Sequence, residues 1–385
     1  MTRSDEDGIT VVATGVSGIL PEQFIRAFLR DGVILAASAF EPAQVQPASL
    51  DLRLGSVAYR VRASFLPGIE ARVLDRLHYM DAYKIDLSNS QVLEFGQVYV
   101  IPLQESLALP GQVQGFANPK STTGRLDILT RLVTDYGTAF DQTIRGYKGP
   151  LYVEVAPKTF SIVVRPGTSL NQIRFQRSSN VTVSPSLLRA RYFADQLVIP
   201  HNPNERLDNN LVPVTIDLRG DPDIKIIGYR AKKHTDRIDL ERVAYYDVED
   251  YWEPISRRKD STLMLDPGDF YILATHEEVR VPPDTAAEMV PYHMRSGEYR
   301  VHYAGFFDPG FGWDRSAGGS KAVLEVRSHG VPFMLEHRQI VGWLRYDNMA
   351  APPDHIYGAG IGSSYQRQGL ALARQFKPYL LARSQ

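Results

Sequence analysis

One short segment combines cations, hydroxyls and a glycine. Residues 118–125 read Asn-Pro-Lys-Ser-Thr-Thr-Gly-Arg, so that Lys120 and Arg125 flank the hydroxyls of Ser121, Thr122 and Thr123. Cations and hydroxyls donate hydrogen bonds to anionic oxygens, and a glycine lets the backbone approach an anion closely. The segment predicts a phosphate cradle, and a polar surface turn is the plainer alternative.

Two glutamates lie inside short apolar runs. Glu154 stands in Tyr-Val-Glu-Val and Glu325 in Val-Leu-Glu-Val. Burial among apolar side chains raises the pKa of a carboxyl toward neutrality, where it can both take and return a proton. These residues are therefore candidate general bases for attack by water. The alternative is that each glutamate points to the solvent face of an alternating strand.

The elements around these residues are mostly short strands. Apolar and polar residues alternate over 46–61, and further short strands are expected at 97–103, 112–117, 151–155 and 161–164, separated by proline and glycine turns. The apolar spacing over 21–30 predicts a helix that ends at Asp31-Gly32, and a second helix is expected near 184–193. The pattern predicts an all-β fold with short peripheral helices.

The second half of the chain repeats the first. Residues 214–220 repeat 48–54 in kind and order, and 266–273 resemble 94–101. The cradle recurs as Arg295 to Arg300, so that Ser121 and Arg125 correspond to Ser296 and Arg300. Asp141 and Asp308 follow the cradles, and Glu154 and Glu325 follow the aspartates. We predict two copies of one β module, at 1–205 and 206–385.

Composition limits the function classes. The 385 residues are 43% hydrophobic with a formal charge of -1, which argues against a general nucleic-acid binder. There is no cysteine, which excludes thiolate zinc sites, and no apolar run near eighteen residues, which argues against a membrane span. A cytoplasmic location is the expectation.

These motifs together resemble the deoxycytidine triphosphate deaminase branch of the deoxyuridine triphosphatase superfamily. Its Asp-Leu-Arg-Leu-Gly strand is similar to 49–55, and its arginine-serine-serine phosphate motif is similar to both cradles. Its Asp-Pro-Gly turn resembles 308–310, and its mobile C-terminal lid resembles Tyr357 and 364–368. The resemblance implies two tandem distorted jelly-roll modules and deamination of dCTP to dUTP and ammonia by a glutamate, without zinc.

The resemblance also implies roles for individual residues. The catalytic candidates are Glu325, Glu154, Ser296, Arg300, Ser121 and Arg125. The substrate-binding candidates are Lys120, Thr122, Arg295, Gly297, Asp141, Asp308, Ala139, Ala304, Val323, Leu324, Tyr357, Tyr365 and Gln368. Magnesium is expected to accompany the triphosphate, and Asp51 or Asp217 would contact it through water.

Three expectations concern assembly and alternatives. The family forms trimers with sites between neighbouring modules, so we expect a homo-oligomer with dCTP as its small-molecule partner and fewer than six working sites in a trimer. A hydrolase that releases pyrophosphate from dUTP, or a bifunctional enzyme, is the first alternative, since Tyr147 lies in a hairpin typical of that branch. A nucleotide sensor without catalysis is the second.

Overall fold

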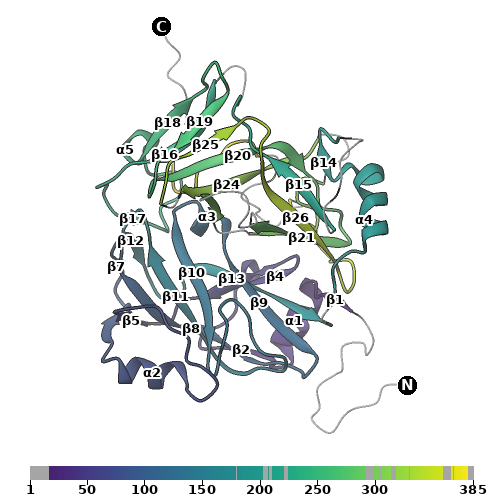
Figure 1. The fold of residues 1–385 in the computed structure, drawn as a ribbon. Helices are drawn as coiled ribbons and strands as arrows, with labels where there is room; N and C mark the ends of the chain where they lie inside the picture. The colour runs from purple at the N-terminus through teal and green to yellow at the C-terminus, as the bar shows by residue number, and fades with distance from the viewer. Residues whose placement is uncertain are drawn as a thin grey trace.

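The computed structural model describes most of the chain as strands. The described residues are 17–178, 180–202, 207, 210–220, 224–291, 299–302, 305–313, 318–328, 330–358, 366 and 368–379, with the backbone alone at 291 and 299–302. Figure 1 shows the first copy in purple to teal below and the second copy in green to yellow above. The expected all-β fold is confirmed.

The strands of the first copy form three sheets. Their pairs within this copy are antiparallel, and the third sheet also contains β17 of the second copy. The strands are β1 (Gly18–Ile19), β2 (Ile34–Ala36), β3 (Val45–Gln46), β4 (Ser49–Arg53), β5 (Val57–Val61), β6 (Tyr83–Asp86), β7 (Gln91–Leu93), β8 (Val98–Ala108), β9 (Val113–Pro119), β10 (Ile128–Thr134), β11 (Lys148–Pro157), β12 (Ile162–Val164) and β13 (Ser169–Arg177).

The second copy follows the same order of long strands. Its strands are β14 (Val198–Ile199), β15 (Leu211–Thr215), β16 (Ile226–Ala231), β17 (Ile238–Asp239), β18 (Trp252–Ser256), β19 (Thr262–Leu265), β20 (Phe270–Val279), β21 (Thr285–Pro291), β22 (Tyr299–His302), β23 (Phe306–Phe307), β24 (Ser320–Ser328), β25 (Phe333–Glu336) and β26 (Ile340–Asn348).

Strand register supports the repeat seen in the sequence. β11 pairs with β8 so that Glu154 lies opposite Val100, and β24 pairs with β20 so that Glu325 lies opposite Ile272. Likewise β13 pairs with β9 in the first copy, and β26 pairs with β21 in the second. The two glutamates thus occupy the same place in two copies of one sheet arrangement.

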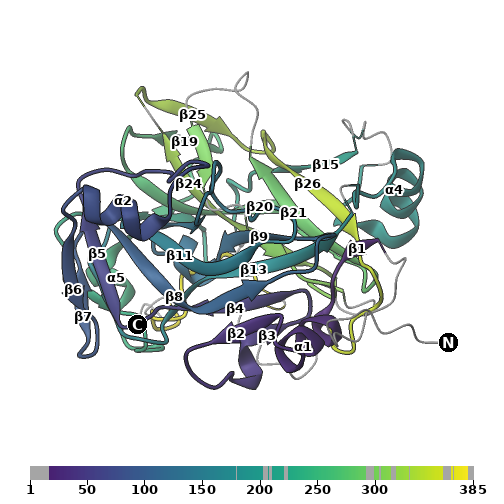
Figure 2. The same ribbon diagram turned by 90° about the horizontal axis from the view of Figure 1, so that it is seen from below.

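The helices are short. They are α1 (Glu22–Arg30), α2 (Val73–Tyr79), α3 (Ser121–Gly124), α4 (Pro185–Arg191), α5 (Val248–Tyr251), the 3-10 helix η1 (Pro42–Gln44) and the π-helix η2 (Tyr192–Gln196). Those labelled α1, α2 and α4 lie at the periphery of the molecule in Figure 2. The expected helices over 21–30 and near 184–193 are confirmed as α1 and α4. None of the helices in the described part of the chain is long and apolar enough to cross a membrane.

The two copies pack tightly against each other. β12 of the first copy pairs in parallel with β17 of the second, with Ile162 opposite Ile238 (Figure 1). Phe160 packs edge-on against Trp252, with ring centroids 5.4 Å apart. These contacts join the modules through a shared core, and α3, with the cradle, lies at their junction.

Candidate active site

A cavity of about 500 Å³ opens where the two copies meet. Five of the predicted residues that line it come from the first copy: Asp51, Lys120, Ser121, Thr122 and Arg125. Five come from the second copy: Asp308, Val323, Glu325, Tyr357 and Gln368. The first-copy cradle therefore faces the second-copy glutamate across the junction.

Glu325 lies in the middle of β24 and is 6% exposed. Burial raises the pKa of its carboxyl from 4.5 to about 8, although the nearby positive charge of Arg125 acts in the opposite direction. At neutral pH this carboxyl is mostly protonated, and a small change in its surroundings ionises it. It has the properties that a group needs to donate and accept a proton near pH 7.

Arg125 connects the cradle to the C-terminal segment. Its guanidinium is buried and donates hydrogen bonds to the Gln368 side-chain oxygen at 2.8 Å and to the Ala371 carbonyl at 3.1 Å. Gln368 in turn donates to the carbonyl of Lys321 on β24 at 3.0 Å. One network thus fixes Arg125, the tail and the strand that carries Glu325.

Lys120 and Asp51 form an ion pair inside the cavity. Asp51 comes from β4, and its Oδ1 is buried with no hydrogen-bond partner among the described residues. Burial raises the pKa of Asp51, while Lys120 opposes that rise. A buried carboxylate oxygen without a partner fits a water-mediated contact to Mg²⁺.

Asp308 also lines the cavity and is held by Arg174 of β13. Arg174 donates a 2.9 Å hydrogen bond to Asp308 Oδ1 and a 3.0 Å bond to the Phe307 carbonyl, and its guanidinium lies 4.0 Å from the centroid of the Phe306 ring. Burial raises the pKa of Asp308, and Arg174 opposes the rise. Sequence reasoning missed Arg174. The sequence feature that could have indicated it is an arginine between two apolar residues, Ile173 and Phe175, in a strand.

Glu154 has surroundings unlike those of Glu325. Arg131, directly opposite on β10, donates to Glu154 Oε1 from Nε at 3.0 Å and from Nη2 at 2.5 Å. The Arg131 guanidinium also lies 3.7 Å from the centroid of the Phe140 ring. Both of these hydrogen bonds go to the same oxygen of Glu154, so that Oε1 is already occupied by a guanidinium. Glu154 does not line the cavity that holds the cradle.

The other first-copy residues are also separated from the cradle. Asp141 lines a second cavity of about 410 Å³ and accepts the Leu132 N–H at 2.8 Å, and burial raises its pKa to about 7. Ala139 lines neither cavity. Asp141 and Ala139 therefore lie apart from Lys120 and Arg125, because the cradle faces the other copy, and their roles in substrate binding stay predictions.

Several predicted positions need separate mention. Leu324 is buried with the core of the second copy, so its side chain does not line the cavity. Arg295, Ser296, Gly297, Ala304 and Tyr365 lie outside the described residues, as does the side chain of Arg300. The second cradle thus has no described side chain.

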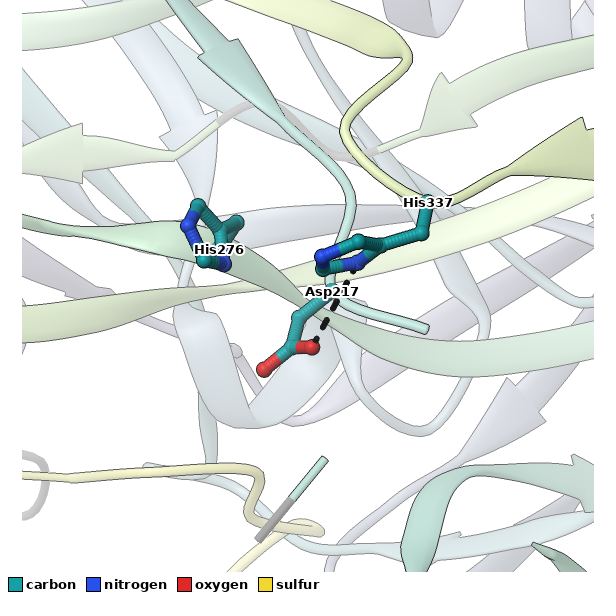
Figure 3. A group of neighbouring side chains, drawn as sticks. All are labelled: Asp217, His276 and His337. Atoms are coloured by element: carbon teal, nitrogen blue, oxygen red, sulfur yellow. Dashed lines mark ion pairs between the residues drawn. The ribbon is translucent and has the colours of Figure 1, made fainter. Parts of the chain in front are cut away.

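Asp217 lies in a different cluster, next to His276 and His337 (Figure 3). The ligand atoms of the three residues lie within 4.8 Å of one another. However, Asp217 Oδ1 accepts the backbone N–H groups of Arg219 and Gly220 at 2.9 and 3.0 Å. These bonds leave Asp217 Oδ1 little capacity for a cation.

Two further ligand atoms of this cluster are also engaged. Lys321 Nζ lies 2.5 Å from Asp217 Oδ2, and the backbone N–H of Leu218 donates to His337 Nδ1 at 3.2 Å. Burial and neighbouring cations lower the pKa of His337. Because a cation and N–H donors already occupy both Asp217 oxygens and His337 Nδ1, the cluster fits a hydrogen-bonded structural role, and Asp217 does not fit a magnesium ligand.

The chain matches two family models in succession. Residues 16–179 match the 2'-deoxycytidine 5'-triphosphate deaminase N-terminal domain, and residues 185–376 match the C-terminal domain of the same family. The predicted module boundary at 205 and 206 stays a prediction.

A solved structure and curated proteins are also similar. The crystal structure of 2'-deoxycytidine 5'-triphosphate deaminase from Agrobacterium tumefaciens superposes with a TM-score of 0.85 at 50% identity, covering 90% of this chain and 100% of that one. A "dCTP deaminase, dUMP-forming" of Kocuria rhizophila is 31% identical over 138 residues, 34% of this chain and 68% of its own length. A "dCTP deaminase" of Haloarcula marismortui is 33% identical over 128 residues, 32% of this chain and 60% of its own length.

Four observations lead to the same assignment. They are the duplicated sheets, the cradle that faces a buried glutamate, the two consecutive family-model matches and the similar solved structure. The chain belongs to the 2'-deoxycytidine 5'-triphosphate deaminase family.

Proposed function

We propose that this protein hydrolyses the C4 amino group of dCTP, giving dUTP and ammonia, at the cavity between its two copies. The observation that carries the proposal is Glu325, a buried carboxyl with a pKa near 8 in the same cavity as the cradle cations. Deamination needs a proton at the ring nitrogen, a base for water and a proton for the departing amine. One carboxyl that titrates near neutral pH can supply all three in turn.

The steps follow from the protonation state of Glu325. The neutral carboxyl donates its proton to N3 of cytosine, and the resulting carboxylate accepts a proton from water as the water oxygen bonds to C4. Glu325 then passes that proton to the amino group, the C4–N bond breaks and ammonia leaves, while the proton of the new C4 hydroxyl passes to Glu325 and restores the neutral carboxyl. The ring N3 keeps its proton in the uracil product, so dCTP and water balance dUTP and ammonia.

Arg125 and Ser121 border the reacting end of the cavity. The positive charge of Arg125 stabilises the carboxylate form of Glu325, which exists only between the proton transfers. Ser121 lines the same wall, where its hydroxyl is suited to hydrogen-bond the attacking water. Both residues therefore act on the state in which the glutamate has given up its proton.

The rest of the cavity fits the sugar and phosphates. Asp308, fixed by Arg174, accepts the deoxyribose hydroxyl, and the Val323 backbone and Tyr357 border the base. Lys120 and Thr122 bind phosphate oxygens, and Mg²⁺ on the triphosphate would contact Asp51 through water. Magnesium supplies charge neutralisation for the triphosphate when it is bound.

A second product is supported by a specific observation. The Kocuria rhizophila relative is named as dUMP-forming, whereas the name of the Haloarcula marismortui relative does not give a product. Asp51, with its buried Oδ1 without a described partner, lies beside Lys120 and is a candidate base for water attack at phosphorus. Deamination followed by release of pyrophosphate would give dUMP.

One assay separates these functions. Purified protein with dCTP and Mg²⁺ is analysed for ammonia, pyrophosphate, dUTP and dUMP. Ammonia with dUTP supports a deaminase alone, and ammonia with dUMP and pyrophosphate supports the bifunctional enzyme. Pyrophosphate without ammonia would favour a dUTP hydrolase, and dCTP binding without any product would favour a sensor.

We also propose a homo-oligomer, with a trimer as the expected form, in the cytoplasm. Among the cavities of the described residues, one contains both a cradle and a candidate base, Glu325. One nucleotide per chain, or three per trimer, is the expected stoichiometry. Calorimetric titration with a non-hydrolysable dCTP analogue, combined with light scattering, measures both quantities.

A further inference from the structure

Arg374 brings a cation from the C-terminal segment into the cavity. It lies six residues beyond Gln368, and its exposed side chain lines the same cavity as Lys120 and Asp51. Burial raises the pKa of Asp51, and the positive charge of Arg374 acts in the opposite direction. The Arg374 guanidinium is therefore close enough to interact with the Asp51 carboxylate. The tail motif recognised in the sequence ends at Gln368, so Arg374 was not among the predicted site residues.

The backbone around Arg374 is fixed even though the side chain is exposed. The Arg374 carbonyl accepts the Ala244 N–H at 2.9 Å, and its neighbours Ala373 and Gln375 are 2% and 1% exposed. Gln375 donates from its side chain to the Leu240 carbonyl at 2.8 Å. The arginine is therefore presented to the cavity from a packed segment.

Further anchoring comes from aromatic packing just after Arg374. The ring of Phe376 lies 5.5 Å from Tyr251 and 5.9 Å from Trp252, centroid to centroid. These contacts pack this part of the tail against the rest of the second copy, so the protein itself positions the backbone that carries Arg374. A cation that is already in position binds an anion at a lower entropic cost.

The other cations of the cavity have partners that Arg374 lacks. Lys120 pairs with Asp51, and Arg125 donates to Gln368 and Ala371. Among the described residues, no carboxylate lies within ion-pair distance of Arg374. A triphosphate carries several negative charges, and a planar guanidinium binds two phosphate oxygens at once.

We propose that Arg374 binds the terminal phosphates of the nucleotide and makes the site selective for triphosphates. This proposal rests on the proposed function for its substrate, but its chemistry requires only a polyphosphate. Arg374 lies six residues beyond Gln368, so it adds a cation from the C-terminal segment to those of the cradle. The cytosine end of the site is then unaffected by its loss.

The main test compares Arg374→Gln with Arg374→Lys and Lys377→Gln. Lys377 is a matched control, because it is exposed on the same segment and pairs with Asp247 at 2.8 Å, outside the cavity. Ammonia release is measured with dCTP and with dCMP. We expect Arg374→Gln to raise the KM for dCTP about ten- to hundredfold, the loss of one charge-assisted contact, with kcat within about threefold.

The substrate comparison separates binding from misfolding. The value of kcat/KM for dCMP should stay at the wild-type level in Arg374→Gln, Arg374→Lys should recover part of the dCTP affinity, and Lys377→Gln should match wild type. An unchanged KM for dCTP would overturn the proposal, as would equal losses for dCTP and dCMP.

A binding measurement keeps this test independent of deamination. Calorimetry with inorganic triphosphate is done on wild type and Arg374→Gln. Weaker binding to the variant, about tenfold or more, supports the role of Arg374 even if wild type releases no ammonia. Equal binding by both proteins refutes that role and leaves the proposed deaminase function standing on its own assay.

Discussion

Replacing Glu325 by glutamine should remove activity and stabilise the protein at alkaline pH. Glutamine keeps the shape of the side chain but has no proton to exchange, so ammonia release from dCTP should fall by at least about a hundredfold. The effect on stability follows from burial. The folded protein holds the Glu325 proton with a pKa of about 8, compared with 4.5 for an ordinary glutamate.

The sign of the stability effect is set by proton binding. Between pH 4.5 and 8 the folded state binds the proton more tightly than the unfolded chain, so the wild-type free energy of unfolding falls as the pH rises through this window. The Glu325→Gln variant has no proton to lose at this position, so its free energy of unfolding does not fall for this reason. The full pKa difference corresponds to about 5 kcal/mol, so we expect a gain of about 2 to 5 kcal/mol above pH 8 and little gain at pH 4.5.

Glu154→Gln is the matched control at the equivalent strand position. Glu154 is 1% exposed but is paired with Arg131, so its replacement leaves a guanidinium without its carboxylate. We expect this variant to lose about 1 to 3 kcal/mol and to keep its deaminase turnover. The two glutamate variants should therefore change stability in opposite directions.

The assay is urea unfolding at pH 5 and pH 8.5, with ammonia release measured on the same preparations. A Glu325→Gln variant that is less stable than wild type at pH 8.5 would refute the inference that Glu325 is a buried, uncharged carboxyl in the folded protein. Undiminished ammonia release from the same variant would refute glutamate catalysis.

Four further predictions follow from the same contacts. Wild-type kcat/KM for dCTP should fall above about pH 8 as Glu325 loses its proton, and a pH profile that is flat or rises to pH 9.5 would contradict the proposed proton donor. Asp308→Asn should raise the KM for dCTP and destabilise the fold by about 1 to 3 kcal/mol, because Arg174 loses its charged partner, as urea unfolding would measure. Gln368→Ala should make the tail more sensitive to limited proteolysis than Lys377→Gln does, since it removes the bridge between Arg125 and the Lys321 carbonyl. Chelation of Mg²⁺ should raise the KM for dCTP more in wild type than in Asp51→Asn, and equal effects would exclude a contact through Asp51.

The fold and the candidate groups could be predicted because the repeat preserves local patterns. Alternating strands, the helix over 21–30, the phosphate cradle and both glutamates are visible in the sequence, and the family resemblance gave roles to the cradle and the glutamates. The sequence could not predict which of the two cradles shares a cavity with which of the two glutamates. Two copies offer two cradles and two bases, and only packing shows that Lys120 and Arg125 face Glu325.

The difference between the glutamates comes from their neighbours across the sheet. Glu154 lies opposite Arg131 on β10, whereas the strand next to Glu325 places His302 at that register. Strand pairing decides which of these residues become neighbours, and their separation in the sequence does not indicate how the strands pair. Arg174 and Arg374 were missed for the same reason, since each reaches the site from a segment outside the recognised motifs.

The central claim is that one chain forms a complete site, with the cradle from its first copy and the base from its second. It is tested most directly by coexpressing Arg125→Gln and Glu325→Gln chains and measuring ammonia release from the purified mixture. Each variant alone should be nearly inactive, and because every chain in the mixture carries one defect in its own site, we predict that the mixture stays inactive. Recovery of activity in the mixture would show that the cradle and the glutamate come from different chains and would contradict the account.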